Sequence, residues 1–155
     1  DRTFIADSYS CRDDKGTHRA INRLRTMCYQ VSKNNTNTCW VLKCDIKKFF
    51  ASIDQKILLS IVTRYISDKD VIWLISRIVN SFYSTRDEVG LPLGNLTSQL
   101  LVNVYMNEFD QFMKHELKVK YYIRYADDFV ILNRNKDFLN ELITKISDFL
   151  NEKLI

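Results

Sequence analysis

The segment that most constrains the fold of this chain is residues 121–132, in which two apolar halves flank a pair of acids. The halves, Tyr121–Ala126 and Phe129–Leu132, are rich in aromatic and β-branched residues, a composition typical of strands. Asp127 and Asp128 lie between them, and aspartate is common in turns. The segment therefore predicts a β-hairpin with two carboxylates in its turn. Such a pair is either ordinary turn chemistry or part of a Mg²⁺ site, since Mg²⁺ prefers carboxylate oxygens held on rigid elements.

The composition fits one folded domain. The 155 residues are 46% hydrophobic and 27% charged, and a single proline and three glycines leave little sequence for linkers. The net charge of +4 allows a nucleic-acid partner but fits an ordinary surface equally well. No apolar run reaches the length of a membrane span and no signal peptide is evident, so we expect no membrane partner. Four cysteines lack C-x-x-C spacing, which disfavours zinc, and free thiols favour a reducing, intracellular setting.

Hydrophobic periodicity predicts helices interspersed with strands. We expect one further strand, Cys39–Ile46, which contains the acid Asp45 near its end, and a loop at Ser84–Asn95. Because the hairpin is antiparallel, we predict an α+β fold rather than a doubly wound parallel sheet. The expected helices span residues 18–32, 55–66, 69–83, 97–117 and 136–154.

Three features carry candidate chemistry: Asp45 after an apolar strand, the segment Gly90–Gln99 before a long helix, and Asp127-Asp128 in the hairpin. If the strand before Asp45 pairs with the hairpin in one sheet, Asp45 and Asp127 converge. Two carboxylates on adjacent strands can hold two Mg²⁺ ions about 3.5–4 Å apart, as two-metal phosphoryl-transfer sites do. Considered alone, Asp45 would equally well be an ordinary acid at a strand end.

Four motifs occur in order along nearly the whole chain. They are Phe4–Ala20, Asp45-Ile-Lys-Lys-Phe-Phe50, the loop and helix start at Gly90–Gln99, and Tyr125-Ala-Asp-Asp128. In order and approximate spacing they resemble the finger-to-palm segment, the first catalytic motif, the loop-helix motif and the Tyr-x-Asp-Asp motif of reverse transcriptases from bacterial and phage retroelements.

The resemblance implies an RNA-directed DNA polymerase, which joins dNTPs to the 3′-hydroxyl of a DNA or RNA primer and copies a retroelement RNA template in the bacterial cytoplasm. It implies a polymerase palm, an antiparallel sheet flanked by helices, with residues 1–38 as the finger-to-palm segment and residues 39–155 as the palm with inserted helices. We expect a single-domain fragment, 1–155, that holds part of the fingers and no thumb. Because a polymerase holds its duplex through many backbone contacts, we expect weak or no activity from these residues alone.

The same resemblance implies the metal site. Asp45 and Asp127 would be the main ligands of two Mg²⁺ ions, which Mn²⁺ can replace, and the backbone carbonyl of Ile46 would complete one coordination shell. Asp128 would be a third and more peripheral catalytic acid, which tunes the field or holds the geometry of the site.

Three residues are candidates for contact with the nucleotide and its base pair. Phe50 resembles the steric gate, a ring that leaves no room for a 2′-hydroxyl; the alternative is a core residue, since adjacent Phe49 and Phe50 cannot both point inward. Gly94 would let the backbone approach the nucleotide closely. Gln99 would contact the template or primer, or else be a solvated residue of the first helical turn.

Four further residues are candidate contacts to nucleic acid or phosphate. Arg12 and Arg19 carry guanidinium groups suited to bidentate phosphate binding, although either could be a surface charge. Arg124 would either face the nucleic acid or pair with a carboxylate. Tyr125 would pack near the primer end, or serve as a plain aromatic residue of the sheet.

The middle motif distinguishes lineages of the family. Group II intron enzymes usually carry Gln-Gly before this helix and Ser-Pro within it, where this chain has Leu93-Gly94 and Ser98-Gln99. The pattern Leu-Gly-Asn-x-Thr-Ser-Gln is more similar to the enzymes of diversity-generating retroelements, which copy a repeat RNA with frequent errors opposite adenine. We therefore predict that subclass, with group II intron enzymes as relatives and an accessory protein as a candidate partner.

Two other functions are compatible with parts of the pattern. The chain could be a non-catalytic RNA-binding, maturase-like module, although the intact acids and the modest net charge of +4 argue against this. A nucleotidyl cyclase also pairs acids in a hairpin, but it would carry Gly-Gly in the turn before them, where this chain has Tyr125-Ala126.

Overall fold

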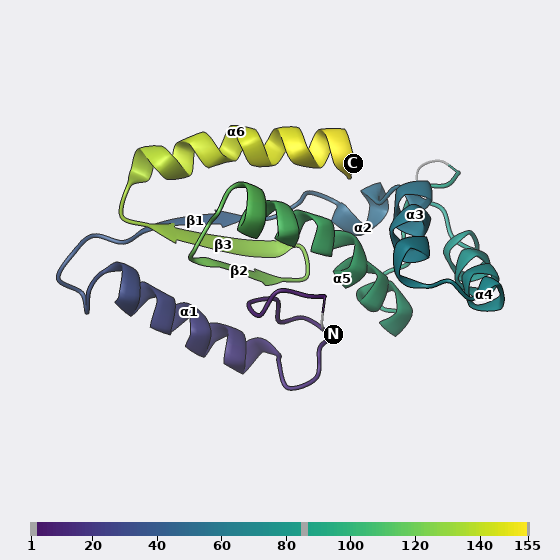
Figure 1. The fold of residues 1–155 in the computed structure, drawn as a ribbon, viewed down its shortest axis with the longest axis horizontal. Helices are drawn as coiled ribbons and strands as arrows, with labels where there is room; N and C mark the ends of the chain where they lie inside the picture. Colours follow the sequence, from purple (N-terminus) through teal and green to yellow (C-terminus); the bar gives the residue numbers. More distant parts are fainter. Residues whose placement is uncertain (1–2, 85–86, 155) are drawn as a thin grey trace.

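The computed structural model describes residues 3–84 and 87–154 and confirms an α+β architecture (Figure 1). The elements, in chain order, are α1 (Thr17–Val31), β1 (Trp40–Cys44), α2 (Phe49–Ser52), α3 (Gln55–Tyr65), α4 (Lys69–Val79), α5 (Leu96–Gln111), the π-helical turn η1 (Phe112–Glu116), β2 (Tyr122–Tyr125), β3 (Asp128–Asn133) and α6 (Lys136–Lys153).

The strands form an antiparallel sheet in the order β1-β3-β2. The predicted hairpin is β2 and β3, and the predicted neighbouring strand is β1, which pairs along β3 with Cys44 opposite Phe129. The N-terminal segment runs parallel to the other edge: the Tyr9 amide donates to the Arg124 carbonyl at 3.0 Å, and the Arg124 amide donates to the Asp7 carbonyl at 2.9 Å. The sheet is thereby extended by a segment for which no strand was predicted.

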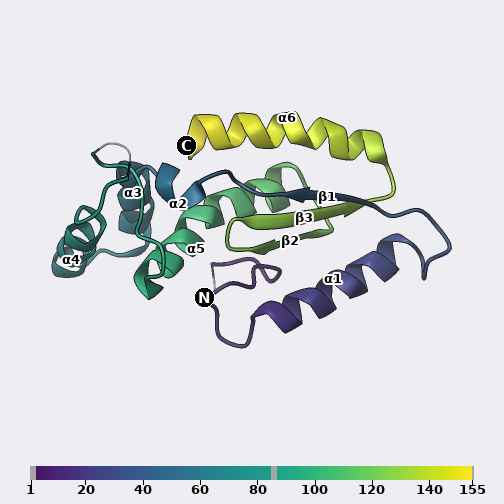
Figure 2. The ribbon, with the colours of Figure 1, turned by 180° about the vertical axis from the view of Figure 1, so that it is seen from behind.

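Alternating residues of the strands face two separate apolar clusters. On one face, Ile123 and Leu132 pack with Met27 and Val31 of α1. On the other, Tyr122, Phe129 and Ile131 pack with residues of α5 and α6. Figures 1 and 2 agree that α1 and α6 lie on opposite sides of the sheet.

Aromatic rings join α5, α6 and the hairpin. The Phe109 ring lies 5.0 Å from that of Phe129, 6.1 Å from that of Tyr122 and 6.0 Å from that of Phe149. Phe112 stacks on Phe149 with 4.1 Å between centroids. Each such pair contributes about 0.5–1.5 kcal/mol beyond the burial of its area, so these contacts fix how the helices sit on the sheet.

The predicted helix 97–117 differs from the structure at its C-terminal end, where the last turn widens into η1. The amide of Leu117 donates to the carbonyl of Phe112, a π-type step, at 3.0 Å. Lys114 then places its ammonium 3.2 and 3.0 Å from the carbonyls of Val119 and Lys120. These donors satisfy carbonyls at the start of the next segment, which explains how the wider turn is accommodated.

Hydrogen bonds join the loop after α4 to α2 and α3. The buried side-chain amide of Gln55 donates to the backbone carbonyls of Phe82 and Gly90, at 2.6 and 2.8 Å. The amides of Gly90 and Leu91 donate to the carbonyls of Ile53 and Phe50, at 2.8 and 2.7 Å. The expected helix 69–83 ends earlier, at Val79, because this loop turns back toward α2. The short helix α2 was not predicted from the sequence.

The described helices include none that is both long enough and apolar enough to cross a membrane.

We predict that Gly90→Ala costs more folding stability than Gly16→Ala. Both glycines have φ near +100°, so either alanine carries backbone strain of about 1–3 kcal/mol. Only at Gly90 would the added Cβ meet an obstacle, 2.8 Å from Ser84 Oγ, whose hydroxyl bonds the carbonyl of Ala51. We expect urea denaturation to show an extra loss of about 1–3 kcal/mol for Gly90→Ala. Equal losses for the two variants would contradict this account of the loop.

Candidate active site

The three predicted acids lie at one end of the sheet. The end of β1 and the β2–β3 turn occupy the same end in Figures 1 and 2. Cys44 pairs with Phe129, so continuing the register by one residue places Asp45 across from Asp128. Tyr125 pairs with Asp128, which leaves only Ala126 and Asp127 in the turn. The pairing of β1 with β3 is the arrangement from which convergence of these acids was predicted.

Asp127 is half-buried, and the negative charges of the other two acids act on its carboxyl group. Burial raises the pKa of its carboxyl group, and the negative charges of Asp45 and Asp128 raise it further. A hydrogen bond from its own backbone and the positive charge of Arg124 act in the opposite direction. A cation bound beside Asp127 would offset this negative charge.

The donor set is of the kind that Mg²⁺ binds, namely carboxylate and carbonyl oxygens. The Ile46 carbonyl also accepts a hydrogen bond from the Phe49 amide at 3.2 Å. Asp128 is exposed, and its carboxylate lies 3.7 Å from the ammonium of Lys43. Within residues 3–84 and 87–154, no three His, Cys, Asp or Glu side chains gather closely enough to hold one ion. The donor types therefore suit a divalent cation and lie at one end of the sheet, but the three acids are not gathered around a single point, and the carboxylate of Asp128 lies beside Lys43.

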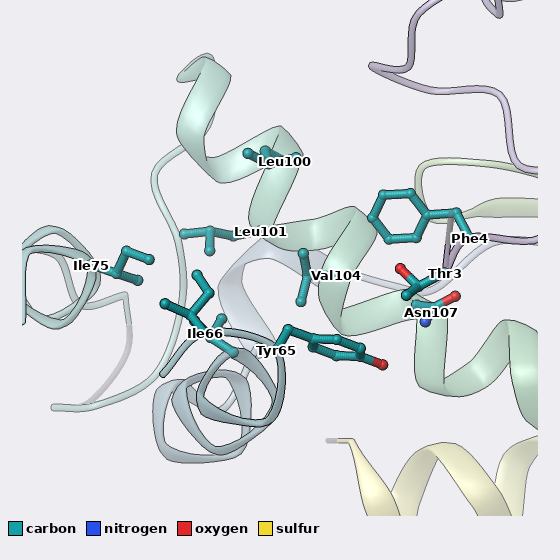
Figure 3. A pocket seen from close by; sticks show the side chains of 10 residues that line it. Thr3, Phe4, Tyr65, Ile66, Ile75, Leu100, Leu101, Val104 and Asn107 are labelled. Atoms are coloured by element: carbon teal, nitrogen blue, oxygen red, sulfur yellow. The ribbon is translucent and has the colours of Figure 1, made fainter. Parts of the chain in front are cut away.

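Two pockets of similar size differ in their relation to the acids. One, of about 290 Å³, lies between the end of β1 and α6 and is lined by Asp45, Ile46, Ile143 and Ser147 among others. The other, of about 310 Å³, is apolar and lies between α3, α4 and α5, where Tyr65 and Leu100 are among its walls (Figure 3). None of the three acids lines the second pocket.

The adjacent phenylalanines occupy different environments. Phe49 is buried and its ring packs 6.3 Å from that of Tyr105. Phe50 is only partly buried and lies edge-on to Phe49 at 6.1 Å. Both lie at the start of α2, so the helix rather than a strand directs one ring inward. The role of Phe50 as a steric gate stays a prediction.

The loop before α5 is open around Gly94. Gly94 has φ +83°, and a Cβ there would have no atom within 4 Å, so the backbone is accessible. Leu93 and Leu96 beside it are mostly exposed. Gln99 is partly buried, and its side-chain oxygen accepts a hydrogen bond from the thiol of Cys11 at 2.8 Å. The first turn of α5 is thus joined to the N-terminal segment, a contact that the sequence did not predict.

Arg12 and Arg19 contact the segment that carries them. Arg12 is partly buried and donates to the carbonyls of Ile5 and Ser8, at 2.6 and 3.0 Å, and burial lowers its pKa. Arg19 is exposed, and its guanidinium donates to the carbonyl of Asp14 and lies 3.8 Å from the carboxylate. Arg12 therefore supports the N-terminal loop, while Arg19 lies on the surface.

Arg124 pairs with a carboxylate, which is the second of the two roles considered for it. Its side chain is fully buried and forms an ion pair with Asp110 of α5 at 2.6 Å, so it does not reach the surface as a nucleic-acid contact would. Burial alone would lower the pKa of Arg124, but the contact with Asp110 turns the net shift upward. Tyr125 is 39% exposed, and its hydroxyl accepts a hydrogen bond from Thr17 at 3.2 Å.

Sequence reasoning missed the buried polar residues of α5, two of which, Asn103 and Asp110, bond Arg124. Asn103, Asn107 and Asp110 are all buried although polar. Their spacing of four and three residues places them on one side of the helix, among buried apolar residues such as Val102 and Met106. That stripe, together with an arginine inside an apolar strand, is the sequence signal that would have predicted a buried ion pair.

Residues 2–155 match the family model described as reverse transcriptase (RNA-dependent DNA polymerase). The chain belongs to the reverse transcriptase family. Among its relatives, protein YkfC of Escherichia coli is 31% identical over 73% of this chain and 30% of its own length. The group II intron-encoded protein LtrA of Lactococcus lactis is 26% identical over 74% of this chain and 18% of its own length. These relatives agree with a reverse transcriptase of bacterial retroelement type, whereas the diversity-generating subclass stays a prediction.

The fold of this reverse transcriptase is also that of a solved telomerase. The apo telomerase of Candida tropicalis, truncated from its C-terminal domain, superposes with a TM-score of 0.69 at 16% identity. The match covers 95% of this chain and 33% of the telomerase. The chain thus spans a third or less of the relatives and neighbours named here.

We predict that Asp127→Asn makes this reverse transcriptase more stable at neutral pH when divalent cations are removed by EDTA. The fold raises the pKa of Asp127, so the folded state binds this proton more tightly than the unfolded state does. Wild type therefore loses stability as the pH rises from below about 4, the unfolded value, through the folded pKa. Asparagine has no charge to lose, so the advantage of the variant should be larger at pH 7 than at pH 3.

Urea denaturation at both pH values measures this difference, with Asp148→Asn on the exposed side of α6 as the control. Added Mg²⁺ should stabilise wild type at pH 7 more than Asp127→Asn, since binding to the folded state alone stabilises it. A variant advantage that stays constant with pH would contradict the burial and charge environment described for Asp127.

Proposed function

We propose that the protein containing this chain is an RNA-directed DNA polymerase that copies a retroelement RNA by joining dNTPs to a primer 3′-hydroxyl. The observation that supports it most is the position of Asp45 and Asp127 at one end of the sheet, on strands that pair through β3. Membership of the reverse transcriptase family supplies the reaction class. The template RNA, the primer and the dNTPs belong to this proposal, as does an accessory protein.

In this proposal, Asp45 and Asp127 hold two Mg²⁺ ions, for which Mn²⁺ can substitute, and the Ile46 carbonyl completes one shell. Asp45 and Asp127 would hold the ions where such ions, when bound, would supply a lower pKa for the attacking 3′-hydroxyl and stabilisation of the charge on the triphosphate and leaving pyrophosphate. By holding the ions, the carboxylates would fix the positions of the attacking and leaving oxygens on opposite sides of the phosphorus in the in-line displacement. Asp128 contributes negative charge from the far side of the turn, where Lys43 balances it.

Residues outside the acids would orient the substrates. Phe50 would lie against the sugar and exclude a 2′-hydroxyl. The accessible backbone at Gly94 would approach the base pair, and Gln99 would reach the template or primer from the start of α5. Exposed Arg19 and Tyr125 are the surface groups of the earlier set that remain candidates for contact with phosphate and primer.

Primer extension on an RNA template, with Mg²⁺ and dNTPs, tests the proposal directly. The whole natural protein that contains this chain is the one to assay, beside Asp45→Asn, Asp127→Asn and the control Asp148→Asn. We expect either site variant to lose roughly 10³-fold or more in rate, because a metal ligand contributes several kcal/mol to transition-state stabilisation. The control should extend primers as wild type does.

The same set of proteins separates polymerase from RNA-binding module. Extension lost only in the site variants, with RNA binding retained, supports catalysis. If wild type extends no primer while all four proteins bind RNA equally, the maturase-like alternative replaces the proposal.

Phe50→Ala tests the choice of sugar. Removing the ring opens the space that a 2′-hydroxyl would fill, so ribonucleotides should be accepted more readily. We expect the preference for dNTP over rNTP, as the ratio of kcat/KM values, to fall about 10- to 100-fold. Leu59→Ala, a partly buried residue of α3, is the control for loss of packing alone and should leave the ratio unchanged. An unchanged ratio in Phe50→Ala would assign the ring to the core.

A further inference from the structure

Arg124 lies at the centre of a sealed polar network beneath the hairpin. Its Nε and Nη2 atoms lie 2.8 and 2.6 Å from the two carboxylate oxygens of Asp110, and both side chains are fully buried. Tyr122 donates its hydroxyl proton to the same carboxylate at 2.6 Å. The guanidinium also donates to Asn103 Oδ1 at 3.3 Å and to Ser8 Oγ at 3.1 Å. Among the described residues, no buried side-chain nitrogen or oxygen lacks a partner, so this network is complete.

One side of the guanidinium reaches the turn that carries Asp127. Nη1 donates to the backbone carbonyl of Ala126 at 2.7 Å. Ala126 has φ +55°, a left-handed conformation that is uncommon for a residue with a Cβ. The Ala126 carbonyl and the Asp127 amide share one rigid peptide plane. A donor held against that carbonyl therefore fixes the plane from which the Asp127 side chain extends.

We propose that Arg124 is a positioning residue that orients Asp127 for metal binding through the carbonyl of Ala126. It touches no substrate itself, since it is fully buried. Asp110 acts as its anchor, because the bidentate pair sets the direction in which Nη1 points. The inference rests on the proposed function, in which Asp127 is a metal ligand.

The geometry requires the guanidinium specifically. Its planar fork presents five N–H donors, and here they reach a carboxylate, a hydroxyl, an amide and a backbone carbonyl. A lysine at this position would keep the charge but has donors on a single nitrogen, which cannot bind Asp110 and Ala126 in the same way. Stability gives little reason to keep a buried ion pair, because the desolvation of two charges offsets their attraction. Holding the β2–β3 turn in place through the Ala126 carbonyl is a reason to keep this ion pair.

Arg124→Lys, compared with Ser8→Ala, tests the proposal. Ser8→Ala removes one hydrogen bond from the same guanidinium but leaves the contact from Nη1 to Ala126. The two readouts are the Mg²⁺ concentration for half-maximal primer extension and the dissociation constant of Mn²⁺, measured by electron paramagnetic resonance without nucleotide. Thermal melts, recorded alongside, report folding.

For Arg124→Lys we expect the half-maximal Mg²⁺ concentration and the Mn²⁺ dissociation constant each to rise at least fivefold. High Mg²⁺ should restore part of the rate. Ser8→Ala should lower the melting temperature while both metal constants stay within twofold of wild type. If both variants only lose stability and keep wild-type metal constants, Arg124 is a structural residue and the proposal is overturned.

Asp110→Asn provides the test if Arg124→Lys does not fold. It keeps the shape of the anchor but removes the charge that holds the guanidinium, so the same rise in the Mn²⁺ constant is expected. Unchanged metal constants in a folded Asp110→Asn would overturn the proposal.

Failure of the proposed function would give a different result from failure of the Arg124 proposal alone. In that case Asp127→Asn would bind Mn²⁺ as wild type does and wild type would not extend primers, and both proposals would fall together.

Discussion

A single buried ion pair joins parts of this protein that are far apart in the sequence. Arg124 comes from β2 and Asp110 from α5, and their network reaches Ser8 of the N-terminal segment and the turn at Ala126. The backbone of Arg124 also pairs with Asp7 and Tyr9 on the edge of the sheet. Removing either charge would leave the other buried without a partner, which costs about 3–5 kcal/mol. The hairpin, the long helix and the N-terminal segment therefore keep their relative positions together or lose them together.

In this arrangement, the residues that hold the backbone around the acids are different from the acids themselves. The negative charges of Asp45 and Asp128 act on the half-buried carboxyl group of Asp127 and raise its pKa, so the acids do not stabilise one another. The apolar clusters on the two faces of the sheet and the polar network beneath the turn hold the backbone instead. The end of the sheet that carries the acids is therefore positioned by paired strands and a complete hydrogen-bond network rather than by the acids.

The elements that were predicted correctly from the sequence are those that short-range patterns determine. The hairpin, the strand beside it and most helices follow from alternation and helical periodicity, and in the structure Asp54 and Asn135 cap two of these helices. The sequence did not predict α2, the π-helical end of α5 or the edge pairing of residues 7–9, because these depend on contacts between distant segments. Arg124 shows the limit for the site: its position in the strand allowed either a nucleic-acid contact or a carboxylate partner, and it did not reveal that the partner is Asp110, fourteen residues earlier and on another element. The roles of Phe50, Gly94 and Gln99 depend on substrates and stay predictions.

The loop after α4 has a consequence for how nucleotide selection could change during evolution. The side chain of Gln55 donates to the carbonyls of Phe82 and Gly90 at the two ends of this loop. The amide of Leu91, in the same loop, donates to the carbonyl of Phe50. A substitution in the loop that shifts Leu91 also shifts the backbone of the residue proposed to exclude ribose. Changes in sugar preference can therefore arise from positions that never meet a nucleotide, and a search for such mutations that is restricted to nucleotide-contacting residues would overlook them.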